Sequence, residues 1–179
     1  MSIQIYILSK LMDENNYPYK LKKELSEPIP FDKIGNLTES KLYYHFESLT
    51  KQGFIEPVEV IKEMHRPDKQ VFAITEKGRN HLPILIYQVL EKAEALSDMI
   101  AGLAFIQFVD RAKVIVILEE KIAKSRENKL YLNDIYTQIN ATGSAKELIH
   151  FYEGYFNNRI DIELNWQEEL LEKIKTHII

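Results

Sequence analysis

The stretch Leu37-Thr-Glu-Ser-Lys-Leu-Tyr-Tyr-His-Phe-Glu-Ser-Leu-Thr-Lys-Gln-Gly-Phe-Ile55 decides the fold. Thr38 is a typical N-cap residue, and Gly53 is typical of the position just after a helix end. Between them, apolar residues recur at the spacing of one helical face: Leu42, Phe46 and Leu49. The pattern predicts a helix of about four turns followed by an extended segment, and such a helix fits the DNA major groove.

Two further helices are predicted before this one. Residues 3–11 carry apolar side chains at helical spacing, and the polar run 13–16 ends that segment. A second helix begins near Pro18, because proline is accepted at the first helical position. Pro28 stops it. Three short helices therefore precede Gly53.

After Gly53 the pattern changes to that of a β-hairpin. Residues 54–64 and 70–74 are rich in β-branched residues, and the polar segment 65–69 lies between them. Pro57 is expected at an edge or a bulge, as a proline in a strand must be. Thr75 then caps the next helix, which Pro83 should bend or restart.

This order of helices and hairpin resembles the PadR family of bacterial transcription regulators. The pieces that carry the resemblance are Tyr19-Lys20-Leu21, Leu42-Tyr43, Leu49-Thr-Lys-Gln-Gly-Phe-Ile55 and Phe72-Ala-Ile-Thr-Glu-Lys-Gly-Arg79. The family often has Tyr-Pro-Ala-Leu where this chain has Tyr43-Tyr44-His45-Phe46. Because of that difference, the base preference of the family cannot be transferred.

The second half of the chain reads as helical throughout. We expect a helix over 84–96, a short apolar helix from residue 97 to Val109, and a long helix that Asp110 caps and that reaches toward Asn140. After a turn, Ser144 and Glu147 have the spacing of a capping box and open the last helix.

The last helix carries a continuous apolar stripe that something must cover. Its members are Leu148, Tyr152, Tyr155, Ile162, Trp166, Leu170 and Ile174. Either the preceding long helix or a second copy of the chain is expected to cover it. Residues 155–175 also resemble the C-terminal domain of the larger PadR proteins, related to virulence activators and phenolic-acid-responsive repressors.

Together these patterns predict a mainly α fold with a small β-hairpin. Residues 1–82 form a winged helix-turn-helix for DNA binding. Residues 83–179 form an all-helical domain for dimerisation, where an effector could also bind.

The resemblance and the helix geometry nominate the residues for DNA contact. They are Thr38, Ser40, Lys41, Tyr43, Tyr44 and Ser48 on the third helix, His65, Arg66 and Lys69 on the wing, and Lys20 on the second helix. Glu47 is either a base reader or a bystander. Each nomination has an alternative without a role in binding. The tyrosines could simply cover the protein surface, the wing residues could form a solvated hairpin tip, and Lys20 could be an ordinary surface charge.

The resemblance further implies a homodimer that binds a palindromic operator in double-stranded DNA and acts as a repressor. A small aromatic or hydrophobic effector would bind near the junction of the domains. Its pocket candidates are Tyr6, Tyr87, Phe105, Phe108 and Trp166, unless these side chains simply fill a core. The competing hypothesis is a winged-helix adaptor that binds protein rather than DNA.

The charge distribution bears on that choice. The net charge is -4, and the acidic excess lies in the second half, because residues 1–79 hold twelve basic and twelve acidic side chains. A neutral DNA-binding half predicts modest non-specific affinity that fades quickly with salt.

The sequence contains no residue pattern that indicates a metal site, a cofactor site or an enzyme. The chain has no cysteine, and its five histidines show no metal-ligand spacing, so we expect neither a metal nor a cofactor. No catalytic motif is present, and we expect no enzyme. The N-terminus does not resemble a signal peptide and no run is long enough to span a membrane, which fits a cytoplasmic protein.

Overall fold

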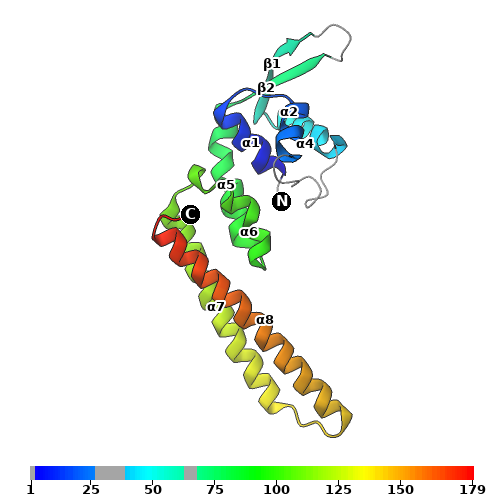
Figure 1. The fold of residues 1–179 in the computed structure, drawn as a ribbon, viewed down its shortest axis with the longest axis vertical. Helices are drawn as coiled ribbons and strands as arrows, with labels where there is room; N and C mark the ends of the chain where they lie inside the picture. Colours follow the sequence, from blue (N-terminus) through cyan, green and yellow to red (C-terminus); the bar gives the residue numbers. More distant parts are fainter. Residues whose placement is uncertain (1–2, 27–38, 63–67) are drawn as a thin grey trace. The chain divides into compact units, whose positions relative to one another are not determined.

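The computed structural model of the chain describes residues 3–26, 39–62 and 68–179 (Figure 1). The chain divides into two compact units. Unit 1 comprises Met1–Lys92 and Asp98–Val109, and unit 2 comprises Ala93–Ser97 and Asp110–Ile179. Compactness alone defines these units, so the functional boundary expected after residue 82 stays a prediction.

Most of the elements belong to unit 1. They are α1 (Ile3–Asp13), α2 (Pro18–Ser26), α4 (Glu39–Lys51), β1 (Ile55–Ile61), β2 (Lys69–Ile74), α5 (Glu76–Lys92), α6 (Leu96–Leu103, of which Leu96 and Ser97 fall in unit 2) and the short 3-10 helix η1 (Ile106–Phe108). Unit 2 contains α7 (Arg111–Gln138) and α8 (Ser144–Lys175). None of the helices in the described part of the chain is both long and apolar enough to cross a membrane.

Helix α1 forms the centre of unit 1. It packs against α4, α5 and β2, while α2 packs against α4. Four aliphatic side chains of α1 are at most 1% exposed: Ile5, Ile7, Leu8 and Leu11. Burying large aliphatic side chains contributes roughly 1.5–3 kcal/mol each, so this helix anchors the others.

The predicted wing is confirmed as an antiparallel β1–β2 hairpin, paired from Ile55 with Ile74 to Ile61 with Lys69. The pairing register shifts between Pro57 and Glu59, which confirms the expectation of an irregularity at the strand proline. The nominated wing residues His65 and Arg66 lie outside the described residues.

The hairpin is tied to the helices at its base. Asn16, after α1, exchanges both backbone hydrogen bonds with Phe72 of β2, at 3.0 and 2.8 Å. This bridge fixes β2 beside the start of α2. The position of the wing relative to the helices therefore rests on main-chain pairing as well as on side chains.

The junction of β2 and α5 confirms the predicted cap. The Thr75 hydroxyl donates to the carbonyl oxygen of Gly53 at 2.7 Å and accepts the Gly78 amide at 3.1 Å. Gly78 lies directly over the Phe54 carbonyl: a Cβ there would stand 2.1 Å from that oxygen. Only glycine allows this close approach of helix and hairpin.

Of the bend or restart expected at Pro83, the restart is wrong. Helix α5 runs without interruption from Glu76 to Lys92 with Pro83 inside it. An interior proline costs about 3 kcal/mol, but Leu82, Ile86 and Leu90 of the same helix are all 0% exposed. Burial of these three side chains offsets the proline, and tertiary packing overrides the local signal.

The apolar segment after α5 is also shorter than expected. Helix α6 ends at Leu103, and a 3-10 turn at Ile106–Phe108 replaces the helix predicted to reach Val109. The side chain of Asp110 accepts the Ala112 amide at 2.9 Å, which confirms the predicted cap of α7.

Helix α8 begins differently from the prediction. Gly143 is the N-cap, with φ of 60°, and Ser144 is already the first helical residue, without a side-chain cap bond. The predicted capping box is therefore wrong, because a box needs Ser144 itself at the cap position. Ion pairs link the two helices of the hairpin, Arg126 to Glu168 and Lys175 to Glu119, both at 2.6 Å.

Candidate nucleic-acid interface

Helix α4 presents one buried and one exposed face. Leu42, Phe46 and Leu49 are 0–1% exposed and fix the helix on the core, as the sequence predicted. The exposed side carries Ser40, Lys41, Tyr43, Tyr44 and Glu47. Tyr44 is 66% and Tyr43 43% exposed. This face is available to a partner.

The nominated Ser48 is less accessible. It is half-buried, and its hydroxyl and carbonyl oxygens both accept the side-chain amide of Gln52, at 3.0 and 3.1 Å. The bond points Ser48 toward the C-terminal end of α4. Contacts to DNA are therefore expected from the first two turns of the helix rather than from Ser48.

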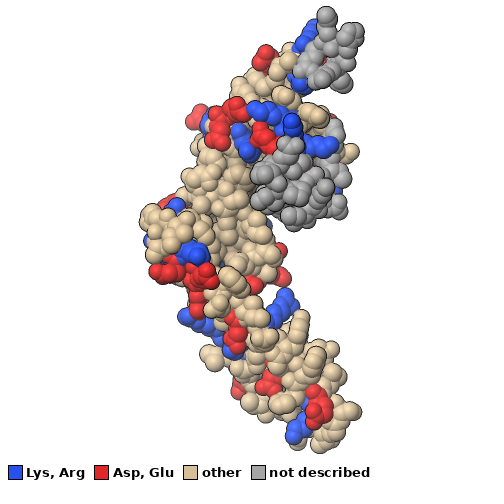
Figure 2. All heavy atoms as spheres, viewed as in Figure 1, with Lys and Arg blue, Asp and Glu red and all other residues tan. Residues whose placement is uncertain are grey.

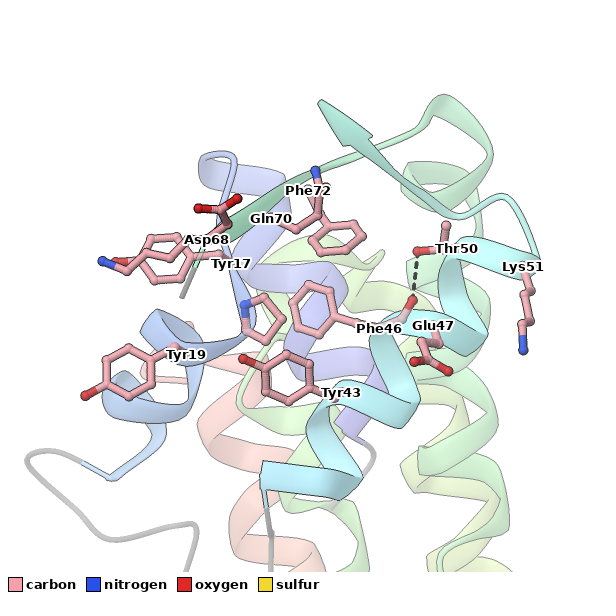
Figure 3. A pocket seen from close by; sticks show the side chains of 12 residues that line it. Tyr17, Tyr19, Tyr43, Phe46, Glu47, Thr50, Lys51, Asp68, Gln70 and Phe72 are labelled. Atoms are coloured by element: carbon pink, nitrogen blue, oxygen red, sulfur yellow. Dashed lines mark hydrogen bonds between the residues drawn. The ribbon is translucent and has the colours of Figure 1, made fainter. Parts of the chain in front are cut away.

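A groove of about 760 Å³ opens beside α4 (Figure 3). It lies between α4, the start of α2 and strand β2. Its lining consists of Tyr17, Pro18, Tyr19, Tyr43, Phe46, Glu47, Thr50, Lys51, Asp68, Lys69, Gln70 and Phe72. The groove brings together two residues that the sequence nominated separately, Tyr43 of the helix and Lys69 of the wing.

The groove also adds three residues that the sequence analysis missed, Tyr17, Tyr19 and Lys51. The stretch Tyr17-Pro18-Tyr19 predicts a helix start, and Tyr19 also belongs to a piece that carries the family resemblance, but neither signal nominates a DNA contact. Two tyrosines around a helix-opening proline are a signal that could have been used, since the N-terminus of the first helix of this motif crosses the DNA backbone.

The electrostatics of the groove are balanced. Lys51 and Lys69 are matched by Glu47 and Asp68. The Lys69 ammonium lies 5.2 Å from the centre of the Tyr17 ring, a cation–π contact that holds it at the groove wall. On the face shown in Figure 2, basic and acidic side chains are likewise interspersed. The tyrosine hydroxyls are therefore hydrogen-bond donors of the groove in addition to the two ammonium groups.

The remaining described residues nominated for DNA contact do not line the groove. Lys20 is already paired: its ammonium donates to Glu14 at 2.5 Å, and that hydrogen bond raises the pKa of Lys20. A phosphate would have to compete with this carboxylate. Thr38, like His65 and Arg66, lies outside the described residues.

The nominated effector residues belong to both units. The Tyr6 ring is 5% exposed and tilted against Phe105 at 6.3 Å, and its hydroxyl donates to the Leu21 carbonyl at 2.8 Å. Burial raises the pKa of this phenol. Tyr87 and Phe108 are half-buried in unit 1, while Trp166 belongs to unit 2 and is 52% exposed. Tyr6 thus packs as a core side chain against Phe105, which is half-buried.

His45 lies next to the exposed tyrosines of α4. Burial lowers the pKa of His45, and its Nδ1 is buried without a hydrogen-bond partner. Among the described residues, no group of three His, Asp or Glu side chains could hold a metal ion.

Comparison with known proteins gives a family match for the segment that contains this surface. Residues 7–83 match the Transcriptional regulator PadR-like family, a match that contains α1, α2, α4 and the wing. A search of curated proteins gave no match.

Solved structures that are similar to this chain include three proteins of low sequence identity. Bacillus subtilis PadR in complex with operator DNA is 17% identical, with 97% of this chain and 99% of that chain covered and a TM-score of 0.42. The protein smu.1604c from Streptococcus mutans is 19% identical, with 99% of each chain covered and a TM-score of 0.43. The Vibrio cholerae virulence activator AphA is 17% identical, with 98% and 99% covered and a TM-score of 0.40.

All three TM-scores lie below 0.5, so the likeness to the family rests on the sequence match of residues 7–83. That match covers the segment in which α4 and the wing meet the groove. By this match, residues 7–83 are similar to the PadR-like family of transcriptional regulators.

Proposed function

We propose that the protein is a homodimeric, cytoplasmic repressor that binds a palindromic operator through the exposed face of α4, the adjoining groove and the wing. The observation that carries this proposal is the exposed Tyr43 and Tyr44 on α4, beside a groove that also contains Lys51 and Lys69. Hydroxyls and ammonium groups are the donors that proteins aim at DNA phosphates.

The contacts divide by position along α4. Ser40, Lys41 and Tyr44 stand near its start and reach base edges or adjacent phosphates. Tyr17, Tyr19, Tyr43, Lys51 and Lys69 line the groove and hold the backbone that passes between helix and wing. Glu47 accepts from a cytosine amine or repels phosphate, and either role restricts the sequences tolerated.

The homodimer is supported by apolar surface that the single chain leaves exposed. Of the stripe predicted on α8, Leu170 and Ile174 are buried, but five members are 46–56% exposed: Leu148, Tyr152, Tyr155, Ile162 and Trp166. A monomer rarely leaves such a contiguous apolar face in water. A twofold dimer would present two recognition helices about 34 Å apart, which requires a palindromic operator.

Repression is the simplest outcome of this arrangement, because occupying a promoter needs no contact with the polymerase. A small aromatic or hydrophobic effector could release the repressor only if it bound the dimer better in a form that misplaces the recognition helices. Tyr6, Tyr87, Phe105, Phe108 and Trp166 remain the nominated residues for that site.

A gel-shift titration tests the proposal. The purified protein is titrated onto DNA from upstream of its own gene at several salt concentrations. We expect selective binding with a steep negative salt dependence, whereas an adaptor that binds only protein would give neither.

Paired charge variants make the test specific. Lys41→Ala with Arg66→Ala should abolish binding and leave dimerisation and helicity unchanged. The matched control, Lys124→Ala with Lys146→Ala, removes the same charge from exposed positions on α7 and α8 and should bind normally. Full affinity in the first variant would mean that DNA binds to another surface.

A further inference from the structure

The groove beside α4 has an apolar floor beneath its polar rim. Pro18 is buried, Phe46 is 1% exposed and Phe72 is half-buried. The rings of Phe46 and Phe72 pack against each other with their centroids 5.0 Å apart (Figure 3). A DNA backbone held at the rim presents phosphates and sugars, which do not fill an apolar floor. The operator contact proposed above therefore leaves this part of the groove without a partner.

Three tyrosines around the floor offer both ring surfaces and hydrogen-bond donors. Tyr17 and Tyr19 flank the first residue of α2, and Tyr43 belongs to the first half of α4. Within the part of the chain that the structure describes, none of their three hydroxyls has a hydrogen-bond partner. A flat ring in the groove would find aromatic surfaces to stack on and donors for acceptor atoms at its edge.

The charges along the groove cancel. Glu47 and Lys51 stand one turn apart on α4, and Asp68 directly precedes Lys69 at the start of β2. A ligand that reaches the floor gives up its water, and desolvating an ion is costly unless an opposite charge compensates. The described lining residues offer no excess of either sign, so the floor favours a neutral ligand over an ion.

We propose that the groove is a binding site for a neutral, flat aromatic molecule with hydrogen-bond acceptors at its edges, and that this ligand and DNA exclude each other. The groove volume of about 760 Å³ lies within the roughly 300–1,000 Å³ of small-molecule sites. The binding site stands on the groove alone, whereas the exclusion of DNA rests on the proposed function. Such a ligand would block the operator contact directly, without a change in the geometry of a dimer.

Caffeine is a suitable probe, because it is neutral and flat and carries carbonyl oxygens but no N–H donor. In an NMR titration of the ¹⁵N-labelled chain, caffeine should shift the backbone amides of residues 17–19, 43–51 and 68–72. Caffeine-8-carboxylate, which adds one negative charge to the same ring system, should need a higher concentration for the same shifts. The fluorescence of Trp166, the only tryptophan and an exposed residue of α8, should not change.

Variants of the rim test the stacking. Tyr19→Ala and Tyr43→Ala should each weaken caffeine binding about fivefold or more, the smallest effect expected when a base loses one stacking ring. Tyr43→Phe should lose less, because it keeps the ring and removes only the hydroxyl. Tyr131→Ala, which removes a 63% exposed tyrosine of α7, should bind caffeine like the natural chain. The shift map of the natural chain locates the site even if a variant does not fold.

The outcomes separate this site from operator binding. No shifts at millimolar caffeine, shifts confined to other segments, or tighter binding of the carboxylate would overturn the inference and leave operator binding standing. If caffeine occupies the groove, saturating caffeine should also release operator DNA in a gel shift. Undiminished DNA affinity under these conditions would overturn the exclusion, and with it the proposed DNA contacts of the groove, while the ligand site would stand.

Discussion

Replacing Gly78 by alanine should separate the hairpin from α5. The new Cβ would stand 2.1 Å from the Phe54 carbonyl oxygen and 2.8 Å from Cγ1 of Ile74. Neither atom can move easily: the oxygen accepts the Thr75 amide at 3.0 Å, and Ile74 is only 7% exposed. The substitution must therefore shift the backbone at the base of the wing.

The expected loss follows from two opposing effects. Overpacking a well-ordered site costs roughly 1–3 kcal/mol, and a backbone obstacle puts this site at the upper end. Alanine has a higher helix propensity than glycine, which stabilises the folded state by about 1 kcal/mol. Gly78→Ala should thus lower the free energy of unfolding of unit 1 by about 2 kcal/mol, or roughly 10 °C in Tm.

Gly154 provides the matched control. It lies inside α8 with nothing within 4 Å of a Cβ placed there. Gly154→Ala should therefore stabilise the protein by up to about 1 kcal/mol. Urea unfolding followed by far-UV circular dichroism reports both units, and fluorescence of Trp166, the only tryptophan, reports unit 2. If Gly78→Ala is as stable as the natural protein, or the two variants shift in the same direction, the close packing of α5 on the hairpin is refuted.

Three further results are expected. Tyr44→Ala should weaken operator binding about tenfold in gel shifts, the loss of one hydrogen bond of about 1.4 kcal/mol to a phosphate, while Tyr131→Ala on α7 should have no effect. Leu49→Ala, at a fully buried site of α4, should lower the free energy of unfolding by about 3 kcal/mol in a urea titration, and a loss below 1 kcal/mol would contradict the packing described. Burial lowers the pKa of both His45 and His81 below the usual 6.5, so the unfolded chain takes up protons more readily. The stability is complete above pH 6.5 and should decline as the pH falls below it, and His45→Asn with His81→Asn should flatten this decline.

The sequence predicted the elements whose signals are local. The apolar spacing of Leu42, Phe46 and Leu49 identified the buried face of α4, and Asp110 capped α7 as expected, because both signals involve neighbours within one or two helical turns. Local signals failed where packing outweighed them. Pro83 remained inside α5 because the surrounding leucine and isoleucine side chains are fully buried.

The groove was beyond prediction for a different reason. Its walls come from residues 17–19, 43–51 and 68–72, which are distant in the sequence. No periodicity connects Tyr17 with Lys69, and their contact depends on the backbone bridge between Asn16 and Phe72. Residue types could nominate Tyr43 and Lys69 separately, but only the fold brings them together.

The continuity of α5 has a practical consequence for work on the isolated DNA-binding part. A fragment ending at residue 82 would cut this helix in the middle and remove Ile86 and Leu90, both fully buried. Exposed apolar groups at the cut would favour aggregation during expression. A fragment ending at Val109 keeps α5, α6 and η1 whole. It is therefore the better choice for crystallising the proposed DNA-binding part with a short DNA duplex.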